Sequence, residues 1–438
     1  MENNIKKTNK FLAYLVVFLG GILLLSGFIA SAGYFGIPFF AGDDFIGRAI
    51  LGIQIGAMAT MFWGLIGGGL ALFHGLRSIA NKPSSQLKLP RFYFFYIFFA
   101  LVLGLGSLLI NADFLGEYLF PPIFLLGAAL PTFAVLAWAF RRLEFPISWR
   151  QGALTFVSGN TLSITVTIIF GGVLSYVFYL IIAPLEYLVG DIFYISSSGI
   201  GGVFERIMYS PMLIFFLLYI AIQAPFPEEF AKALGPRLMR SRIQNEAQAF
   251  ALGLASGAGF AVIENMLYQG VMANWSGWTW GGITALRGIG AVGHPLWTGI
   301  LALAIYRERN QSSGWFGRLL RAYLVSVGLH TLWNGGYMAL FYMLGLENIE
   351  NIGGEILIYG EYFKISLIFI LTVLTAFNWW LLARITKSLA PNAELESLPV
   401  AISHRALALW AIAVTAIILP VGAALGGAWE EIQHVIMP

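Results

Sequence analysis

Long apolar segments recur along almost the whole chain, and they constrain its fold more than any other feature of the sequence. Most of them reach the ~20 residues that a helix needs to cross about 30 Å of hydrocarbon. We place eleven of them at residues 11–33, 49–74, 93–111, 119–140, 152–184, 207–226, 247–270, 283–306, 319–344, 364–383 and 406–427. Because lipid offers no partners to backbone polar groups, these segments predict an all-α, polytopic transmembrane helical bundle with about eleven spans.

The small share of charged residues excludes a soluble globular protein. Charged residues make up 11% of the chain and hydrophobic residues 58%, whereas about 25% of a soluble domain is charged. The chain contains no cysteine, which excludes disulfides and thiolate metal sites. The first apolar segment follows Lys6, Lys7 and Lys10, and its length favours a retained span over a cleaved signal peptide.

Basic residues fall mainly on one side of the predicted bundle. Of the 25 lysines and arginines, only Arg48, Arg206, Arg287 and Lys364 lie outside the loops that alternate to that side. Loops rich in positive charge face the cytoplasm. We therefore expect the N-terminus in the cytoplasm and, with an odd number of spans, the C-terminus outside.

Three local features carry structural expectations. The loop that contains Trp275, Trp278 and Trp280 fits an aromatic anchor at the outer membrane interface. The fifth apolar segment is long, and we expect it to be tilted or broken near the glycine pair at 171–172. The GxxxG pair that starts at Gly253 predicts close packing of the seventh span, because small residues let helices approach in lipid.

Ionisable residues inside the predicted spans are few, and they gather on four consecutive segments. Such residues are costly in a bilayer and are usually functional. Of the five histidines, only His294 and His330 lie near the middle of a span. The candidate site residues are Glu228, Glu229 and Lys232 at the end of the sixth span, Glu264 in the seventh, His294 in the eighth, and His330 and Asn334 in the ninth.

The positions of four of these residues along their helices predict one common depth. Glu228 lies 16 residues before the turn expected near residue 244, and Glu264 lies 20 residues after it. His294 and His330 lie 18 residues on either side of the turn expected near residue 312. At about 1.5 Å per residue all four lie ~24–30 Å from their turns, near the middle of the membrane. We expect them to surround one cavity.

Helical spacing adds two residues to this group. Lys232 follows Glu228 by four residues, and Asn334 follows His330 by four residues, so each pair shares a helix face. Two carboxylates and two imidazoles around a cavity can activate water and stabilise an oxyanion. The pattern therefore indicates a hydrolytic site inside the membrane.

Other functions remain open at this stage. Glu264 could pair with Arg287 or a histidine for helix packing, and His330 and Asn334 could join neighbouring helices, as polar residues do in ordinary bundles. Intramembrane carboxylates and histidines also relay protons in transporters and channels, although no inverted repeat is visible. A membrane scaffold with inactive motifs is the third alternative.

The order of the motifs resembles that of the PrsW family of intramembrane proteases, which is related to the CAAX prenyl endopeptidase and Abi superfamily. The family pattern is EExxK or EExxxR, then FxxxE or FxxxH, then one or two helices with histidine that end in HxxxN or HxxxD. The matches are Glu228-Glu229-Phe230-Ala231-Lys232, Phe260 to Glu264, His294, and His330 to Asn334. They cover about a third of the chain and leave the five N-terminal spans unexplained.

The resemblance implies a role for each residue around the acidic pair. Glu228 would be the general base that activates water, helped by Glu264 or His294. Glu229 and Lys232 would hold this base in place.

The resemblance also implies roles for the last motif and for a metal. His330 and Asn334 would polarise the scissile carbonyl and hold the oxyanion. Family members are discussed both as metalloproteases and as glutamate-type proteases, and His294, His330 and Glu264 are a chemically suitable set of zinc ligands. The chain has no HExxH motif, and we favour a metal-free glutamate mechanism.

These expectations divide the chain into three regions. Residues 1–206 would form an N-terminal five-span membrane region, residues 207–345 a PrsW-like four-span catalytic core, and residues 346–438 a C-terminal two-span region. The resemblance implies an intramembrane endopeptidase in the cytoplasmic membrane of a prokaryote. Its partners would be the lipid bilayer and a membrane protein substrate, with no nucleic acid.

Overall fold

The computed structural model describes most of the chain between residues 2 and 389. The described residues are 2–40, 48–80, 82–110, 112–177, 180, 217, 219–238, 243–273, 277–310, 313–346 and 354–389. Within these ranges the regular structure is helical, apart from one isolated bridge between Gln86 and Ser148. The prediction of an all-α bundle is confirmed.

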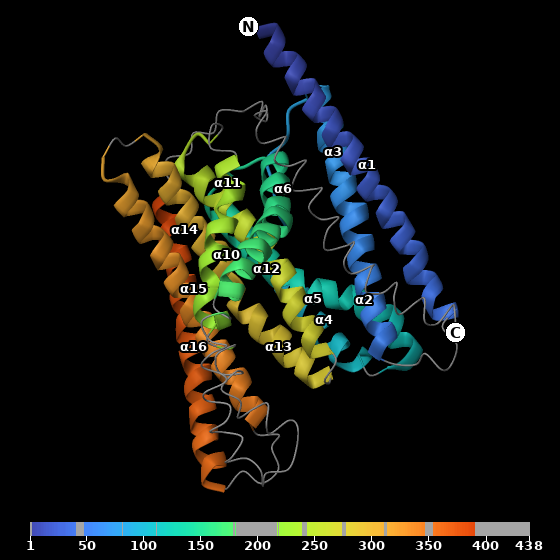
Figure 1. The fold of residues 1–438 in the computed structure, drawn as a ribbon, viewed down its shortest axis with the longest axis vertical. Helices are drawn as coiled ribbons and strands as arrows, with labels where there is room; N and C mark the ends of the chain where they lie inside the picture. The colour runs from blue at the N-terminus through green and yellow to red at the C-terminus, as the bar shows by residue number, and fades with distance from the viewer. Residues whose placement is uncertain are drawn as a thin grey trace.

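Glycines join the first helices into a closely packed hairpin (Figure 1). Helix α1 (Glu2–Phe40) lies against α2 (Arg48–Phe62), a π-helical turn (Trp63–Gly67) and α3 (Gly68–Ile79). A side chain at Gly27 would overlap the backbone of Gly64, and a side chain at Gly64 would overlap the backbone of Gly27. Because helix association in lipid depends on such close approach, these glycines explain why the two long apolar helices run side by side.

Three further helices connect this hairpin to the rest of the bundle. They are α4 (Phe92–Leu109), α5 (Asp113–Arg142) and α6 (Trp149–Ser158). Helix α6 begins with a capping box, in which the Ser148 side chain accepts the N–H of Gln151 and the Gln151 side chain accepts the N–H of Ser148. This reciprocal pair satisfies two N–H groups at the start of the helix.

The expected irregularity of the fifth span exists, but it lies earlier than predicted. A π-helical turn (Gly159–Ser163) follows α6, and the chain is α-helical from 164 to 177, across the glycine pair at 171–172. A side chain at Gly159 would overlap the carbonyl oxygen of Ser256. The helix therefore changes its winding where its backbone meets a neighbouring helix, a position typical of π-helical turns near functional sites.

Helix α12 (Glu246–Ala273) is the most enclosed of the candidate membrane spans. It packs against α5, α6 and α14 (Gly293–Arg307). Gly253 faces Gly299 of α14, and a side chain at Gly257 would overlap the carbonyl oxygen of His294. The prediction that the GxxxG pair packs a helix is confirmed, and this contact also fixes the backbone of a candidate site residue.

The remaining elements lie around α12 and α14 (Figure 1). They are a π-helical turn (Tyr219–Gln223), α10 (Pro225–Lys232), α11 (Leu234–Leu238), α13 (Gly277–Ile289), two 3-10 turns (Gly290–Val292 and Glu308–Asn310), α15 (Trp315–Leu346) and α16 (Gly354–Leu389). Helices α14, α15 and α16 lie next to one another, and the short α10 contacts α15.

Eight helices in the described part of the chain are long and apolar enough to cross a membrane. They cover Val16–Gly36, Gln54–Ile79, Phe92–Leu109, Tyr118–Arg142, Trp149–Val177, Glu246–Gln269, Trp280–Arg307 and Ile365–Leu389. The predicted ninth span is the 32-residue α15, whose hydropathy is lowered by His330 and Asn334. The predicted span 406–427 and most of 207–226 lie outside the described residues. A total of about eleven spans stays a prediction.

The prediction of an interfacial anchor is wrong for Trp280. This side chain is fully buried, and its ring packs edge-on against Phe120 of α5. Gly106 of α4 leaves room for the indole, because a side chain at this position would overlap it. Trp280 therefore joins three helices instead of facing the membrane surface. Trp275 lies outside the described residues.

The charge bias predicts that the loop between α14 and α15 lies in the cytoplasm. Because the chain has no cysteine, Ser312→Cys creates a single labelling site. We expect a membrane-impermeant thiol reagent to label this cysteine in inverted vesicles and to leave it unlabelled in intact cells. Asp113→Cys, on the opposite predicted side, should give the reverse pattern. Labelling of position 312 from outside would overturn the orientation.

Candidate active site

Helix α10 carries the acidic pair into the interior of the bundle. It begins at Pro225, whose fixed φ suits the first turn of a helix. Glu229 and Lys232 have no exposed surface, whereas Glu228 is 8% exposed. All three charged residues on this short helix are buried, and Glu228 is the least enclosed of them.

Two serines from other elements hold the end of α10. Ser163, at the end of the π-helical turn, donates to the carbonyl oxygen of Ala231 at 3.0 Å. Ser256 of α12 donates to the carbonyl oxygen of Lys232 at 2.7 Å. Since the last carbonyls of a helix have no partner within it, these bonds fix α10 and the position of its acidic residues.

The ammonium of Lys232 lies between both carboxylates and an imidazole. Its Nζ is 2.6 Å from Glu229 Oε1, 2.9 Å from His294 Nδ1 and 3.6 Å from Glu228 Oε2. It also lies 4.3 Å from the centre of the Phe260 ring. We expected Lys232 to pair with Glu228 at four residues' spacing, but Glu229 is the closer partner. A buried lysine needs such compensation of its charge.

His330, which lies on α15, contacts both carboxylates of the acidic pair on α10. Its Nδ1 is 2.9 Å from Glu229 Oε1, and its Nε2 is 3.6 Å from Glu228 Oε2. The ring of Trp297 stacks on the imidazole, with centres 4.9 Å apart and an angle of 25° between the planes. Because Nδ1–H donates to Glu229, Nε2 of a neutral His330 carries the lone pair and faces Glu228.

A second ion-pair chain holds His294 from the other side. Its Nε2 lies 2.6 Å from Glu264 Oε2, within the distance of an ion pair. Arg287 donates to Glu264 Oε2 at 2.7 Å and to Asn265 Oδ1 at 2.8 Å. Asn265 donates in turn to the carbonyl oxygen of Ala128 on α5 at 3.0 Å. The alternative in which Glu264 pairs with Arg287 and a histidine is therefore observed.

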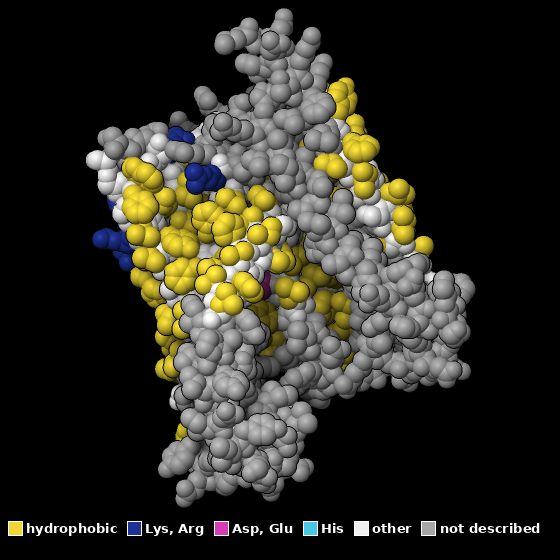
Figure 2. Space-filling model, viewed as in Figure 1, with side chains coloured by type: hydrophobic (Ala, Val, Ile, Leu, Met, Phe, Trp, Pro, Cys, Tyr) yellow, Lys and Arg dark blue, Asp and Glu magenta, His cyan; other side chains and the backbone are white. Residues whose placement is uncertain are grey.

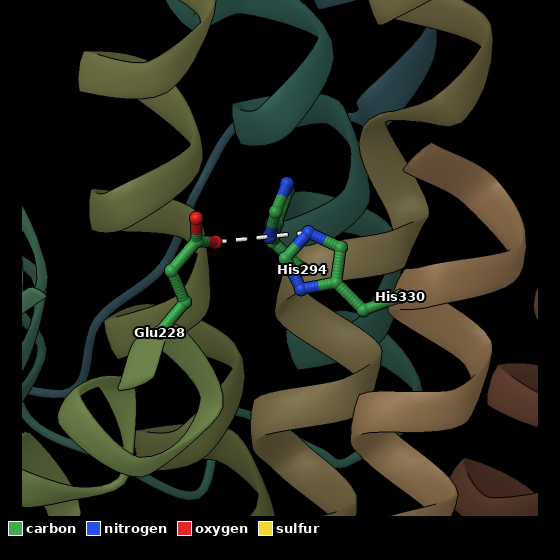
Figure 3. Close-up of side chains that lie close together, drawn as sticks. All are labelled: Glu228, His294 and His330. Atoms are coloured by element: carbon green, nitrogen blue, oxygen red, sulfur yellow. Dashed lines mark ion pairs between the residues drawn. The ribbon is translucent and has the colours of Figure 1, made fainter. Parts of the chain in front are cut away.

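Three atoms in the middle of this cluster can bind a metal ion or water. Glu228 Oε2 and His330 Nε2 have no hydrogen-bond partner within the described residues, and the third atom, His294 Nε2, faces the Glu264 carboxylate. All three lie within 4.8 Å of one another and come from α10, α14 and α15, with the side chains directed toward one another (Figure 3). Two imidazoles and a carboxylate are a common set of zinc ligands. Glu228 completes this group instead of the expected Glu264, whose Oε2 is bound by Arg287.

The structure thus brings together Glu228, Glu264, His294 and His330, as their common depth predicted. Asn334 is 2% exposed and lies one turn after His330 on α15. Their roles in a reaction, and those of Glu229 and Lys232, stay predictions.

Two contributors escaped the analysis of the sequence. Trp297 follows His294 by three residues on one helix, so its place beside the site could have been found from spacing. Ala128 accepts the bond from Asn265 with its backbone carbonyl. Because every residue has such a carbonyl, the sequence cannot indicate which one is used.

Comparison with known proteins bears on the same part of the chain. A family model described as PrsW family intramembrane metalloprotease matches residues 148–374, just over half of the chain. The match begins at the cap of α6 and includes all seven candidate site residues. No curated protein and no solved structure matches the chain.

Proposed function

Because the chain belongs to the PrsW family of intramembrane metalloproteases, we propose that it hydrolyses peptide bonds of membrane-associated proteins at Glu228, His294 and His330. The observation that supports this most directly is that buried ligand atoms of these three residues face one another, and that those of Glu228 and His330 have no hydrogen-bond partner among the described residues. A buried polar atom without a partner costs about 1–3 kcal/mol. A purely structural ion-pair network would avoid that cost, whereas a site that binds water, substrate or a metal requires such atoms.

We propose Glu228 as the general base. Its Oε2 accepts no hydrogen bond from the described residues, and its side chain is the less enclosed of the buried acidic pair. Lys232, at 3.6 Å, stabilises the carboxylate form. Glu228 takes a proton from the attacking water as the new C–O bond forms, and passes it to the amide nitrogen as the C–N bond breaks. Glu229 is enclosed by Lys232 and His330 and acts as a positioning residue.

We propose His330 and Asn334 as the donors that stabilise the oxyanion. Since Nδ1 of His330 already donates to Glu229, donation to an oxyanion requires a proton on Nε2 as well. The Glu229 carboxylate compensates the positive charge of such a ring. Asn334 shares a face of α15 with His330 and offers an amide donor.

The same residues fit the divalent metal that the family description implies. Glu228, His294 and His330 would hold it, since each directs a buried oxygen or nitrogen atom that can be a ligand into the cluster. When bound, a metal such as zinc supplies a Lewis acid that polarises a carbonyl and activates water. Lys232 donates to Nδ1 of His294, so the proton on Nε2 of a neutral His294 must leave before that atom can be a ligand. In this form Glu228 would be a ligand and not the base.

Metal titration distinguishes Glu228 as a general base from Glu228 as a metal ligand. We expect the purified full-length protein to bind about one zinc per chain, and His294→Ala and His330→Ala to lose it, because each removes one of only three ligands. His74→Ala, on α3, should bind as the unmodified protein does. Isothermal titration and elemental analysis measure the stoichiometry. Full cleavage activity in metal-free protein would support the Glu228 base, whereas activity that returns only with zinc would contradict it.

A further inference from the structure

A groove opens where α10, α11, α14 and α15 meet, on the side of α10 away from the acidic pair. Its volume of about 520 Å³ lies within the ~300–1,000 Å³ typical of sites for small molecules. Its apolar walls include Phe230, Leu234, Leu301, Ile305, Phe316 and Leu320. Phe230 faces the groove, whereas the adjacent Glu229 is turned into the bundle.

Large apolar side chains at this groove are exposed. Phe230 is 48% exposed, Trp315 is 46% and Phe316 is 64%. Figure 2 shows hydrophobic side chains gathered over this part of the molecule, with basic side chains at the edge of the patch. In a membrane-spanning bundle such a surface faces lipid, and a tryptophan beside it is typical of the headgroup level.

The charges around the groove are positive on balance. Arg237 is exposed, and its guanidinium has no hydrogen bond or ion pair with any residue that the structure describes. Arg309 is held in place by the carbonyl oxygen of Ile243 at 2.8 Å. Glu308 is the one carboxylate among the described lining residues, and Arg318 donates to both of its oxygens at 2.7 and 2.6 Å. These bonds keep the pKa of Glu308 below its usual value, so its charge is present and is balanced by Arg318.

The groove lies at the end of the bundle where the basic loops gather. Arg237, Arg309 and Arg318 belong to the side that the distribution of charge assigns to the cytoplasm. The cytoplasmic leaflet carries anionic lipids, and basic pockets between helices on this side bind anionic headgroups. The groove combines apolar walls with two arginines. An anionic lipid has the matching chemistry, because its acyl chains are apolar and its headgroup is negatively charged.

We propose that this groove binds one anionic phospholipid, with its phosphate at Arg237 and Arg309 and an acyl chain along Phe230, Leu301 and Phe316. Tyr323, which also lines the groove, donates to the carbonyl oxygen of Phe226 at 2.7 Å and so joins α15 to the N-terminal turn of α10. A bound lipid therefore contacts both helices that carry Glu228 and His330, and it steadies the distance between them.

The test compares two lipids of equal chain length on the full-length protein in detergent. Native mass spectrometry should detect one dioleoyl-phosphatidylglycerol bound at least about tenfold more tightly than dioleoyl-phosphatidylcholine, because both lipids offer a phosphate to the arginines but the choline ammonium of phosphatidylcholine offsets its negative charge. Arg237→Gln should remove this preference. Arg384→Gln, an exposed arginine on α16, should keep it. Leu320→Trp, which places a large side chain in the groove, should weaken the binding of both lipids.

Other outcomes would overturn the proposal. Equal binding of the two lipids to the unmodified protein, or an undiminished preference in Arg237→Gln, would show that the groove does not select an anionic lipid. Displacement of the phospholipid by millimolar inorganic phosphate would indicate a plain anion site. If Arg237→Gln impaired cleavage of a substrate while lipid binding was unchanged, the groove would bind the substrate protein instead. The lipid readout needs no proteolysis, so its failure is separate from failure of the proposed function.

Discussion

Glu228→Gln should lower the rate of substrate cleavage per folded molecule by about 10²–10⁴, the range typical of a lost general base. The amide keeps the shape of the side chain but cannot take a proton from water. Glu229, and not Glu228, makes the close contacts with Lys232 and His330, so the substitution leaves these bonds in place. The measurement is cleavage of a single-span substrate in the same vesicles, normalised to the amount of folded enzyme.

A matched variant and a milder one make this result specific. Glu246→Gln removes a carboxylate that pairs with Arg307 at 2.7 Å, away from the cluster, and should cleave at the normal rate. Asn334→Ala should lower the rate by about 10²–10³, as for one lost oxyanion donor. If Glu228→Gln cleaved at nearly the normal rate per folded molecule, Glu228 would not be the base, and Glu229 or Glu264 would be the next candidate.

Lys232→Met should destabilise the protein by about 3–5 kcal/mol, the usual effect of removing one partner from a buried ion pair. Methionine fills a similar volume but leaves the fully buried Glu229 without its nearest positive charge, and it removes the donor to His294 Nδ1. Thermal unfolding in detergent measures the change, and cleavage per folded molecule should fall as well. Lys387→Met, at an exposed lysine of α16, is the matched control.

A double variant separates lost charge balance from lost packing. Lys232→Met combined with Glu229→Gln removes both buried charges and should recover part of the lost stability, because the two residues are in contact and their effects are not additive. An equal or larger loss in the double variant would contradict the proposed charge balance. A single variant as stable as Lys387→Met would show that Lys232 does not hold the acidic residues.

The sequence predicted the overall fold and the meeting of the site residues because both depend on simple periodic constraints. A helix has a fixed rise, so the distances of Glu264 and His294 from their turns gave a common depth, and the structure places these side chains 2.6 Å apart. The apolar length needed to cross lipid likewise located eight helices that are observed as candidate spans.

The features that were missed depend on contacts between elements that are distant in sequence. Trp280 is buried because Gly106 of another helix leaves room for it, and no pattern near Trp280 reveals this. The winding of the fifth span changes at Gly159, against the backbone of α12, and not at the glycines that stood out locally. Lys232 is bound more closely by Glu229 than by Glu228, since the direction of a side chain within one helical turn is decided by what surrounds the helix.

The bond from Asn265 to Ala128 has a consequence for how the chain can be divided. The family match begins at residue 148, whereas Ala128 lies on α5, which ends at Arg142 and packs along α12. A fragment cut at residue 148 would leave the amide of Asn265 without its acceptor and would uncover a flank of the most enclosed span. Helix α5 therefore belongs to the same packed unit as α12, and a fragment that keeps this interior intact must begin before α5.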